Sequence, residues 1–400
     1  MSNQPDTSAP SRFSIWRDCF VTSLGLGLTS FGGPIAHLGY FERTYVTRKG
    51  WLDAARYAQI VSLCQVLPGP ASSQANFLIG WMRGGGMGAL LSFIGFTAPS
   101  AALMVLAALF LDKLGSVQIF VHAMFLVAAV IVGQAVWSMA GKLWRGRGWV
   151  VGVLATIPCI LFGGIYVQLA VIVMGGIAGA LFFKKTDADA PSAPLPEFVS
   201  LGVALRCAGA FLALLALLPL IVAISPAPDI YSIADVFYRS GALVFGGGHV
   251  VLPLLYDALP AVQEQMLFLY GAAQALPGPL FSIAAALGVL LLPSAPLAGA
   301  AIASFFVFLP GLLIATSGAY FWQRVFAHRG MQAALSGINA AVVGILAGAF
   351  VNPVVLKAVT SPYDLAFVII ALAGAIYMRA PAYAVIALCV VYAAAAGALT

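Results

Sequence analysis

Two short proline–glycine motifs interrupt long apolar runs in the sequence, LPGP at 67–70 and LPGP at 276–279. Proline lacks the backbone N–H that a helix interior uses, and it biases the preceding residue away from helical angles. Each motif should therefore break a helix. A half-helix that begins just after such a break directs free N–H groups and its positive dipole end into the interior. The pattern predicts an anion site built largely of backbone, without a buried charge.

Polar and flexible residues stand close to both breaks. Gln65 and Gln274 each precede the first proline by three residues, and a neutral amide can donate to an oxyanion. Phe-Gly-Gly segments upstream offer bends where backbone can approach a ligand closely. The candidate residues of the permeation path are Phe31, Gly32, Gly33, Pro34, Glu42, Arg43, Gln65, Pro68, Gly69, Pro70, Ser72, Phe245, Gly246, Gly247, Gly248, His249, Gln274, Pro277, Gly278 and Pro279. The alternative, that the motifs are kinks for helix packing and the amides satisfy local backbone, stays open.

The two motifs recur in the same order, which indicates an internal duplication. The Phe-Gly-Gly segment precedes the glutamine of the break by 34 residues in the first half and by 29 in the second. We expect a first repeat of about six spans at 1–183 and a second of about six at 232–400. Between them, 184–231 holds a polar, proline-rich linker and one connecting span. About thirteen spans would place the second repeat upside down relative to the first.

Composition restricts the class of protein. Hydrophobic residues make up 62% of the chain and charged residues 8%, far from the balance of a soluble domain. The apolar runs lack the alternation of a membrane barrel, so we predict an all-α, multi-pass protein of the lipid bilayer. The net charge of +6 fits positive cytoplasmic loops better than a nucleic-acid partner. The five cysteines show no paired spacing, and no metal, cofactor or enzymatic motif is expected.

One basic loop does not fit the expected topology. With the N-terminus inside, most Lys and Arg residues fall in the cytoplasm, but the loop with Arg43, Arg48, Lys49 and Arg56 would lie outside. Either the loop has a functional reason to be positive, or one broken element re-enters the membrane instead of spanning it. Small-xxx-small glycine pairs such as Gly175 and Gly179 could pack helices within one chain or join two chains as a homodimer.

The motifs together resemble those of the chromate ion transporter family. The matching segments are Phe31–Pro34, YFERTYVTRKGW at 40–51, QVLPGP at 65–70, FGGGH at 245–249 and QALPGP at 274–279. The likeness covers both halves, as in the long, two-domain form of that family. It implies a secondary transporter that exports chromate from the cytoplasm across the inner membrane, with sulfate, another tetrahedral oxyanion or chromate/sulfate exchange as alternatives. Glu42, Arg43, Gln65, Pro68, Gly69 and Pro70 are the positions that the resemblance marks. The second half departs from the first at Gly248, where the first has Pro34.

Overall fold

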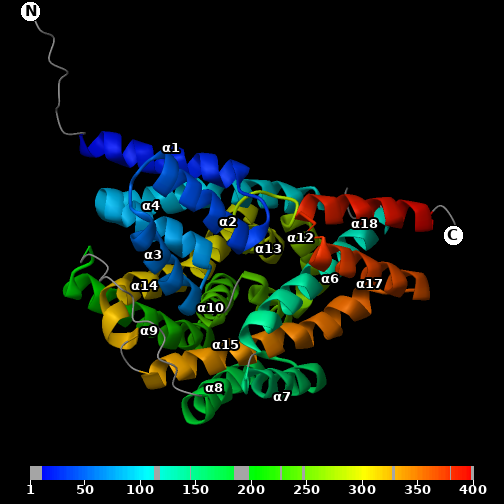
Figure 1. The fold of residues 1–400 in the computed structure, drawn as a ribbon. Helices are drawn as coiled ribbons and strands as arrows, with labels where there is room; N and C mark the ends of the chain where they lie inside the picture. Colours follow the sequence, from blue (N-terminus) through cyan, green and yellow to red (C-terminus); the bar gives the residue numbers. More distant parts are fainter. Residues whose placement is uncertain are drawn as a thin grey trace, which may run out of the picture.

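The computed structural model describes residues 11–111, 118–144, 146–183, 198–225, 228–245, 248–326, 329–378 and 380–397. Within these ranges every regular element is helical (Figure 1). Five helices are long and apolar enough to cross a membrane: Ala71–Leu109, Ile119–Leu143, Leu201–Ile224, Pro296–Trp322 and Gly330–Ala358. The all-α membrane class is confirmed. The count of thirteen spans is not, because several of the expected spans are pairs of shorter helices.

The apolar run at 14–45 forms a helical hairpin. Helix α1 (Arg12–Thr29) ends at a bend, and α2 (Gly33–Phe41) continues as the π-helix η1 (Glu42–Arg48) in the opposite direction. Lys49 at the end of η1 forms an ion pair with Asp18 near the start of α1, with 2.7 Å between Nζ and Oδ1. The basic loop therefore lies at the same end of the molecule as the start of α1, as the re-entrant alternative predicts.

The run at 54–82 is a second hairpin that opens at the same end. Helix α3 (Ala54–Val66) leads into the first proline–glycine break, and α4 (Ala71–Leu109) leads out of it. Arg83 returns to the level of Trp51 and lies over its ring, 5.5 Å from the centroid. At Gly84–Gly85 the backbone leaves helical angles, and the remainder of α4 crosses the molecule beside α1.

The second repeat has the same order of elements. Helix α10 (Pro228–Leu243) precedes η2 (Gly248–Val250) and α11 (Val251–Ala258), and then η3 (Pro260–Val262) and α12 (Gln263–Ala273) lead to the second break. After the break come η4 (Leu280–Ser282), α13 (Ile283–Leu291) and the long α14 (Pro296–Phe326). Helix α9 (Leu201–Ile224) stands before this repeat and packs on α10 and α14.

The two equivalent long helices, α6 (Gln118–Leu143) and α15 (Arg329–Ala349), run antiparallel. The indole Nε1 of Trp144, just past α6, donates to the carbonyl of Ala340 at 3.1 Å, whereas Gly133 packs against Phe350. Rising residue numbers in one helix thus meet falling numbers in the other. This is the orientation that inverted repeats predict.

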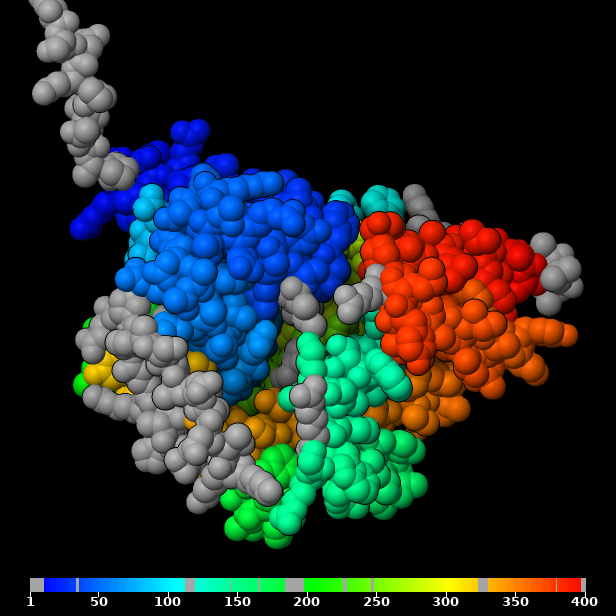
Figure 2. Space-filling view, in the orientation of Figure 1, coloured from blue at the N-terminus to red at the C-terminus, as the bar shows by residue number. Residues whose placement is uncertain are grey.

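The last hairpin of each repeat packs on the long helix of the other repeat. Helices α7 (Gly148–Leu161) and α8 (Ile165–Phe182) lie against α15, while α17 (Pro362–Tyr377) and α18 (Ala382–Gly397) lie against α6 (Figure 1). In Figure 2 the red C-terminal hairpin sits beside the teal segment that contains α6. Between α15 and α17 the chain forms η5 (Phe350–Val355) and α16 (Leu356–Ala358).

The small-xxx-small glycines allow the exchanged hairpins to pack closely against the long helices. Gly175 and Gly179 on α8 meet Gly337 on α15, and Gly344 on α15 meets Gly152 on α7. These glycines are used inside one chain, so they give no support to a homodimer.

Candidate functional site

The two helix breaks meet the two Phe-Gly-Gly bends across the repeats. The N–H of Gly69 donates to the carbonyl of Val244, just before the second bend, at 2.7 Å. The N–H of Gly278 donates to the carbonyl of Ser30, just before the first bend, at 2.9 Å. Both glycines have positive φ, +119° and +100°, which residues with a Cβ rarely adopt. The four motifs found in the sequence thus form one reciprocal crossing, which we call the break crossing.

A second set of contacts fixes each break to the helix that follows the break of the other repeat, α14 or α4. The Nε2 of Gln74, which is fully buried, donates to the carbonyls of Pro68 at 2.7 Å and of Gly311 at 2.9 Å. Gly311 directly follows Pro310 of α14. On the other side Gly278 lies against Ser100, which directly follows Pro99 of α4. The residues that follow Pro310 and Pro99, Gly311 and Ser100, therefore contact the two breaks.

The backbone N–H groups at the two breaks, which the sequence predicts to be free, are only partly free. The N–H groups of Gly69 and Gly278 bind carbonyls, which corrects the simplest form of the prediction. In α4 the first intrahelical bond in this turn runs from the N–H of Gln74 to the carbonyl of Pro70, at 3.0 Å. The N–H groups of Ala71, Ser72 and Ser73 precede it, and the proline at the N-cap has no side-chain oxygen to cap them. The start of α4 is thus the better anion site.

A buried polar cluster lies against the start of α4. The Nδ1 of His37 on α2 is hydrogen-bonded to Ser72 Oγ at 3.3 Å, and the side chain of His37 is 1% exposed. Its ring meets Phe96 edge-on, with centroids 5.5 Å apart. Among the described residues, His37 Nε2, Ser30 Oγ and Ser73 Oγ are buried atoms without a hydrogen-bond partner. We call Ser30, His37, Ser72 and Ser73 the hydroxyl–imidazole cluster.

Sequence reasoning did not select His37, because it considered this histidine only as a metal ligand. A usable signal was present: a histidine follows the Phe-Gly-Gly bend in each repeat, at positions 37 and 249. In the second repeat His249 Nδ1 is hydrogen-bonded to the hydroxyl of Tyr270 at 2.6 Å. The side-chain Nε2 of Gln274 is buried without a hydrogen-bond partner in the described structure.

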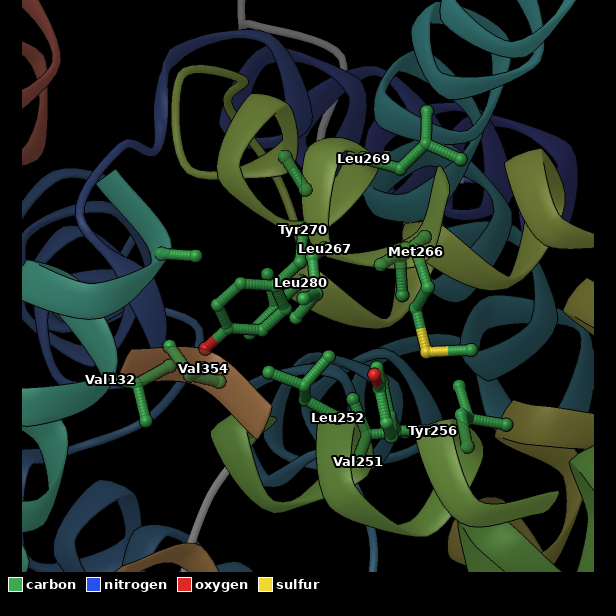
Figure 3. Close-up of a cluster of buried hydrophobic side chains, with 14 of the residues drawn as sticks. Val132, Val251, Leu252, Tyr256, Met266, Leu267, Leu269, Tyr270, Leu280 and Val354 are labelled. Carbon is green, nitrogen blue, oxygen red and sulfur yellow. The ribbon is translucent and has the colours of Figure 1, made fainter. Parts of the chain in front are cut away.

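The surroundings of the second histidine are far more apolar. Figure 3 shows the Tyr270 ring between Leu267 and Leu280, with its hydroxyl directed toward Val132 and Val354. Where the first repeat has Ser72 two residues after its break, the second has Phe281, which contacts Phe308 of α14. The two halves are therefore not equivalent, and the polar half is the first.

The other predicted residues are spread along the two hairpins. Gln65 is exposed on α3, and Glu42 and Arg43 are exposed on η1, two to three turns from the bend. Phe31 is 42% exposed at the bend, with Gly32 and Gly33 at positive φ beside it. Pro70, Pro277 and Pro279 are buried at the break crossing, Pro68 is partly buried, and Gly248 is buried in η2. Gly246, Gly247 and the side chain of Pro34 lie outside the described residues.

A charged cleft opens at the end where both hairpins of the first repeat begin. Its volume is about 260 Å³, and it is lined by Ser14, Ile15, Arg17, Asp18, Val21 and Arg83. Asp18 is already paired with Lys49, so the two arginines give the cleft a positive balance. Further inward, Ser23, Tyr45 and Asn76 form a buried hydrogen-bonded group between the cleft and the break crossing. No group of three metal-ligating side chains occurs in the part of the chain that the structure describes.

Comparison with known proteins gives a consistent result. The family model for chromate transporters matches residues 17–180 and 231–397. A probable chromate transport protein of Synechococcus elongatus is 27% identical over 339 residues, 82% of each chain. The chromate transport protein of Cupriavidus metallidurans is 24% identical over 350 residues, 84% of this chain and 82% of its own. The uncharacterized transporter YwrB of Bacillus subtilis is 27% identical over 179 residues, 43% of this chain and 90% of its own. No solved structure matches.

Proposed function

Because the chain belongs to the chromate transporter family, we propose that it is a secondary transporter that exports chromate from the cytoplasm across the inner membrane. The oxyanion binds near the membrane midplane, where the broken helices meet. The observation that carries this proposal is the break crossing, in which Gly69 and Gly278 each bind the bend of the other repeat. Inverted repeats with interrupted helices at their interface are the usual construction of alternating-access transporters.

Reciprocal contacts between the repeats support an alternating mechanism. The two hairpins of the first repeat open at one end of the molecule, where Lys49 meets Asp18 and Trp51 meets Arg83. The second repeat is antiparallel to it, so its hairpins open at the other end. A tilt of one repeat against the other would expose the break crossing first to one end and then to the other. The division into repeats at 1–183 and 232–400, with 184–231 between them, is part of this proposal.

Sulfate transport is the second candidate. Chromate and sulfate are both tetrahedral dianions, and neutral donors such as Ser73 Oγ and the N–H groups of α4 recognise the shape and charge that the two share. An exchange of chromate for sulfate would use the same site in both directions.

The test is uptake of labelled chromate into everted membrane vesicles that contain the protein. We expect uptake above that of vesicles without the protein, with competition by sulfate stronger than by chloride. Sulfate loaded inside the vesicles should accelerate uptake if the protein is an exchanger. Equal uptake of chromate and of sulfate by vesicles with and without the protein would refute oxyanion transport altogether.

A further inference from the structure

We propose that His37 is a direct ligand of the transported oxyanion and donates a hydrogen bond to it through Nε2. The anion would lie between the imidazole, the hydroxyl of Ser30 and the uncapped first turn of α4. This inference rests on the proposed function and names the residues that hold its substrate. Neither the motifs nor the matching relatives assign a role to this histidine.

The first argument is the unpartnered nitrogen. His37 is 1% exposed, and its Nε2 is buried without a side-chain hydrogen-bond partner in the described structure, with the backbone of Ser30 within range of the imidazole. Buried polar atoms are nearly always hydrogen-bonded, because desolvation without a partner costs about 1–3 kcal/mol. The Oγ atoms of Ser30 and Ser73, both fully buried, are in the same condition. A group of unpartnered polar atoms beside an uncapped helix start is what a site for a polar ligand should contain.

The second argument is the direction of the hydrogen bonds. A neutral imidazole has one donor and one acceptor nitrogen. The hydroxyl of Ser72 lies 3.3 Å from Nδ1 and can donate to it, which leaves the proton on Nε2. Nε2 is then a donor, like the first N–H groups of α4 and the serine hydroxyls. Every group offered to the ligand can therefore be a donor, and a fully deprotonated oxyanion is the ligand class that accepts from all of them.

The third argument is electrostatic. The acidic side chain of α1, Asp18, lies at the outer end of the helix and is paired with Lys49. Apart from His37 itself, α2 and the first two turns of α4 contain no acidic or basic residue, and the neighbouring Phe96 and Ser100 are neutral. The positive end of the α4 dipole is then the main fixed field at the cluster, and it favours an anion. Neutral donors also let the anion leave, which a transporter requires.

The two histidines of the repeats are not equivalent in this scheme. His249 is hydrogen-bonded through Nδ1 to Tyr270, which lies among mainly apolar side chains (Figure 3). We therefore expect one anion site, in the first repeat, instead of two related by symmetry.

The experiment compares the chain with its His37→Phe and His37→Leu variants in proteoliposomes. Phenylalanine keeps the ring against Phe96 and removes both nitrogens. We expect the KM for chromate to rise about 10- to 100-fold, the range for losing one hydrogen bond to a charged ligand. His37→Gln, which retains a donor, should recover part of the affinity. Ser30→Ala should raise KM, whereas Ser92→Ala, which removes another buried unpartnered hydroxyl of α4 away from the break, should not.

Thermal stability in detergent provides a second readout. Chromate should raise the Tm of the unaltered chain and of Ser92→Ala, because a ligand stabilises the state that binds it. It should not raise the Tm of His37→Phe at the same concentration. If the histidine variants fold, transport chromate and keep a KM within twofold of the parent, the role of His37 is refuted while the transport function stands. If the parent chain itself neither transports nor is stabilised by chromate or sulfate, the proposed function fails and this inference fails with it.

Discussion

At the scale of single residues, the glycine of each break forms a backbone hydrogen bond with the bend of the other repeat. Proline and glycine have local conformational preferences, so LPGP within an apolar run is enough to predict an interrupted helix. The acceptor of the Gly69 N–H is Val244, 175 positions away along the chain. Such a pairing depends on how the repeats pack, and a residue pattern carries no information about it. The burial of His37 against Ser72 is likewise tertiary, whereas the histidine after the Phe-Gly-Gly bend of each repeat was visible in the sequence.

The glycine of each break should resist even the smallest substitution. A Cβ on Gly69 would lie 2.7 Å from Gln74 Nε2 and 2.8 Å from Gly311 Cα, and one on Gly278 would lie 2.7 Å from Ser100 Oγ. The positive φ adds roughly 1–2 kcal/mol of strain for a residue with a Cβ. We expect Gly69→Ala and Gly278→Ala to lower the Tm in detergent and to reduce chromate transport at least tenfold.

The control is Gly85→Ala, since Gly85 also has a positive φ, +66°, but has open space around its Cβ position. Gly85→Ala should show the effect of backbone strain alone, which is a small fall in Tm with nearly normal transport. Equal losses at Gly85 and Gly69 would mean that the close contacts at the break crossing are unimportant.

At the scale of elements, hydropathy could not separate one span from two shorter helices. The run at 14–45 has the length of a spanning segment, yet it forms α1 and the reversed α2–η1 arm. Amino-acid composition does not depend on the direction in which the chain runs. Only a helix-breaking motif could therefore show that the chain reverses within this run. Helix α3 has 13 residues and rises about 20 Å, too short for a hydrocarbon core of about 30 Å. The hairpin therefore favours re-entry as the explanation of the positive-inside exception, which stays a prediction.

The re-entrant hairpins make a topological prediction. In a chain from which the native cysteines have been removed, Ser14→Cys, Thr47→Cys and Gly86→Cys should all react with an impermeant thiol reagent from one side of the membrane. Ser294→Cys, in the turn between α13 and α14, should react only from the other side, because that turn corresponds to the Gly84–Gly86 turn of an inverted repeat. Labelling of Ser14 and Thr47 from opposite sides would show that the first run spans.

The charged cleft at the same end predicts a salt-dependent effect. Arg17 and Arg83 are exposed at its rim, and long-range attraction of a dianion falls off over a Debye length of about 8 Å at physiological salt. We expect Arg17→Gln combined with Arg83→Gln to raise the KM for chromate about three- to tenfold at low salt, with the maximal rate little changed. The defect should shrink as ionic strength rises.

Arg206→Gln supplies the comparison, because Arg206 is an exposed arginine on α9 outside the cleft. It should leave KM unchanged at every salt concentration. A KM defect in the double variant that stays constant from low to high salt would argue against steering and for a local structural role of the arginines.

At the scale of the whole molecule, the repeats are held together by exchanged hairpins. The C-terminal hairpin is fixed to α6 by a buried carboxylate, Asp364, whose Oδ1 accepts from Tyr392 at 3.0 Å and lies 3.1 Å from His122 Nε2. Its Oδ2 accepts from the N–H groups of Thr360 and Ser361. A buried carboxylate with this many donors is well satisfied and holds a specific geometry. The duplication was visible in the sequence, but the exchange was not, because both arrangements bury the same apolar faces.

The exchange predicts how the chain behaves when it is divided. If a first fragment ends at Phe183 and a second begins at Phe198, each lacks the surface on which its own last hairpin packs. The α7–α8 pair needs α15, and the α17–α18 pair needs α6. We expect the fragments to copurify and to transport chromate when coexpressed, and each to aggregate or be degraded when made alone. As a matched control, coexpression with Gly175→Leu, which would collide with Gly337 and Ala341 of α15, should abolish copurification and lower both fragments to the levels seen when each is made alone. Stable, monodisperse single fragments would show that each repeat folds without its partner, and the exchange would then be incidental to assembly.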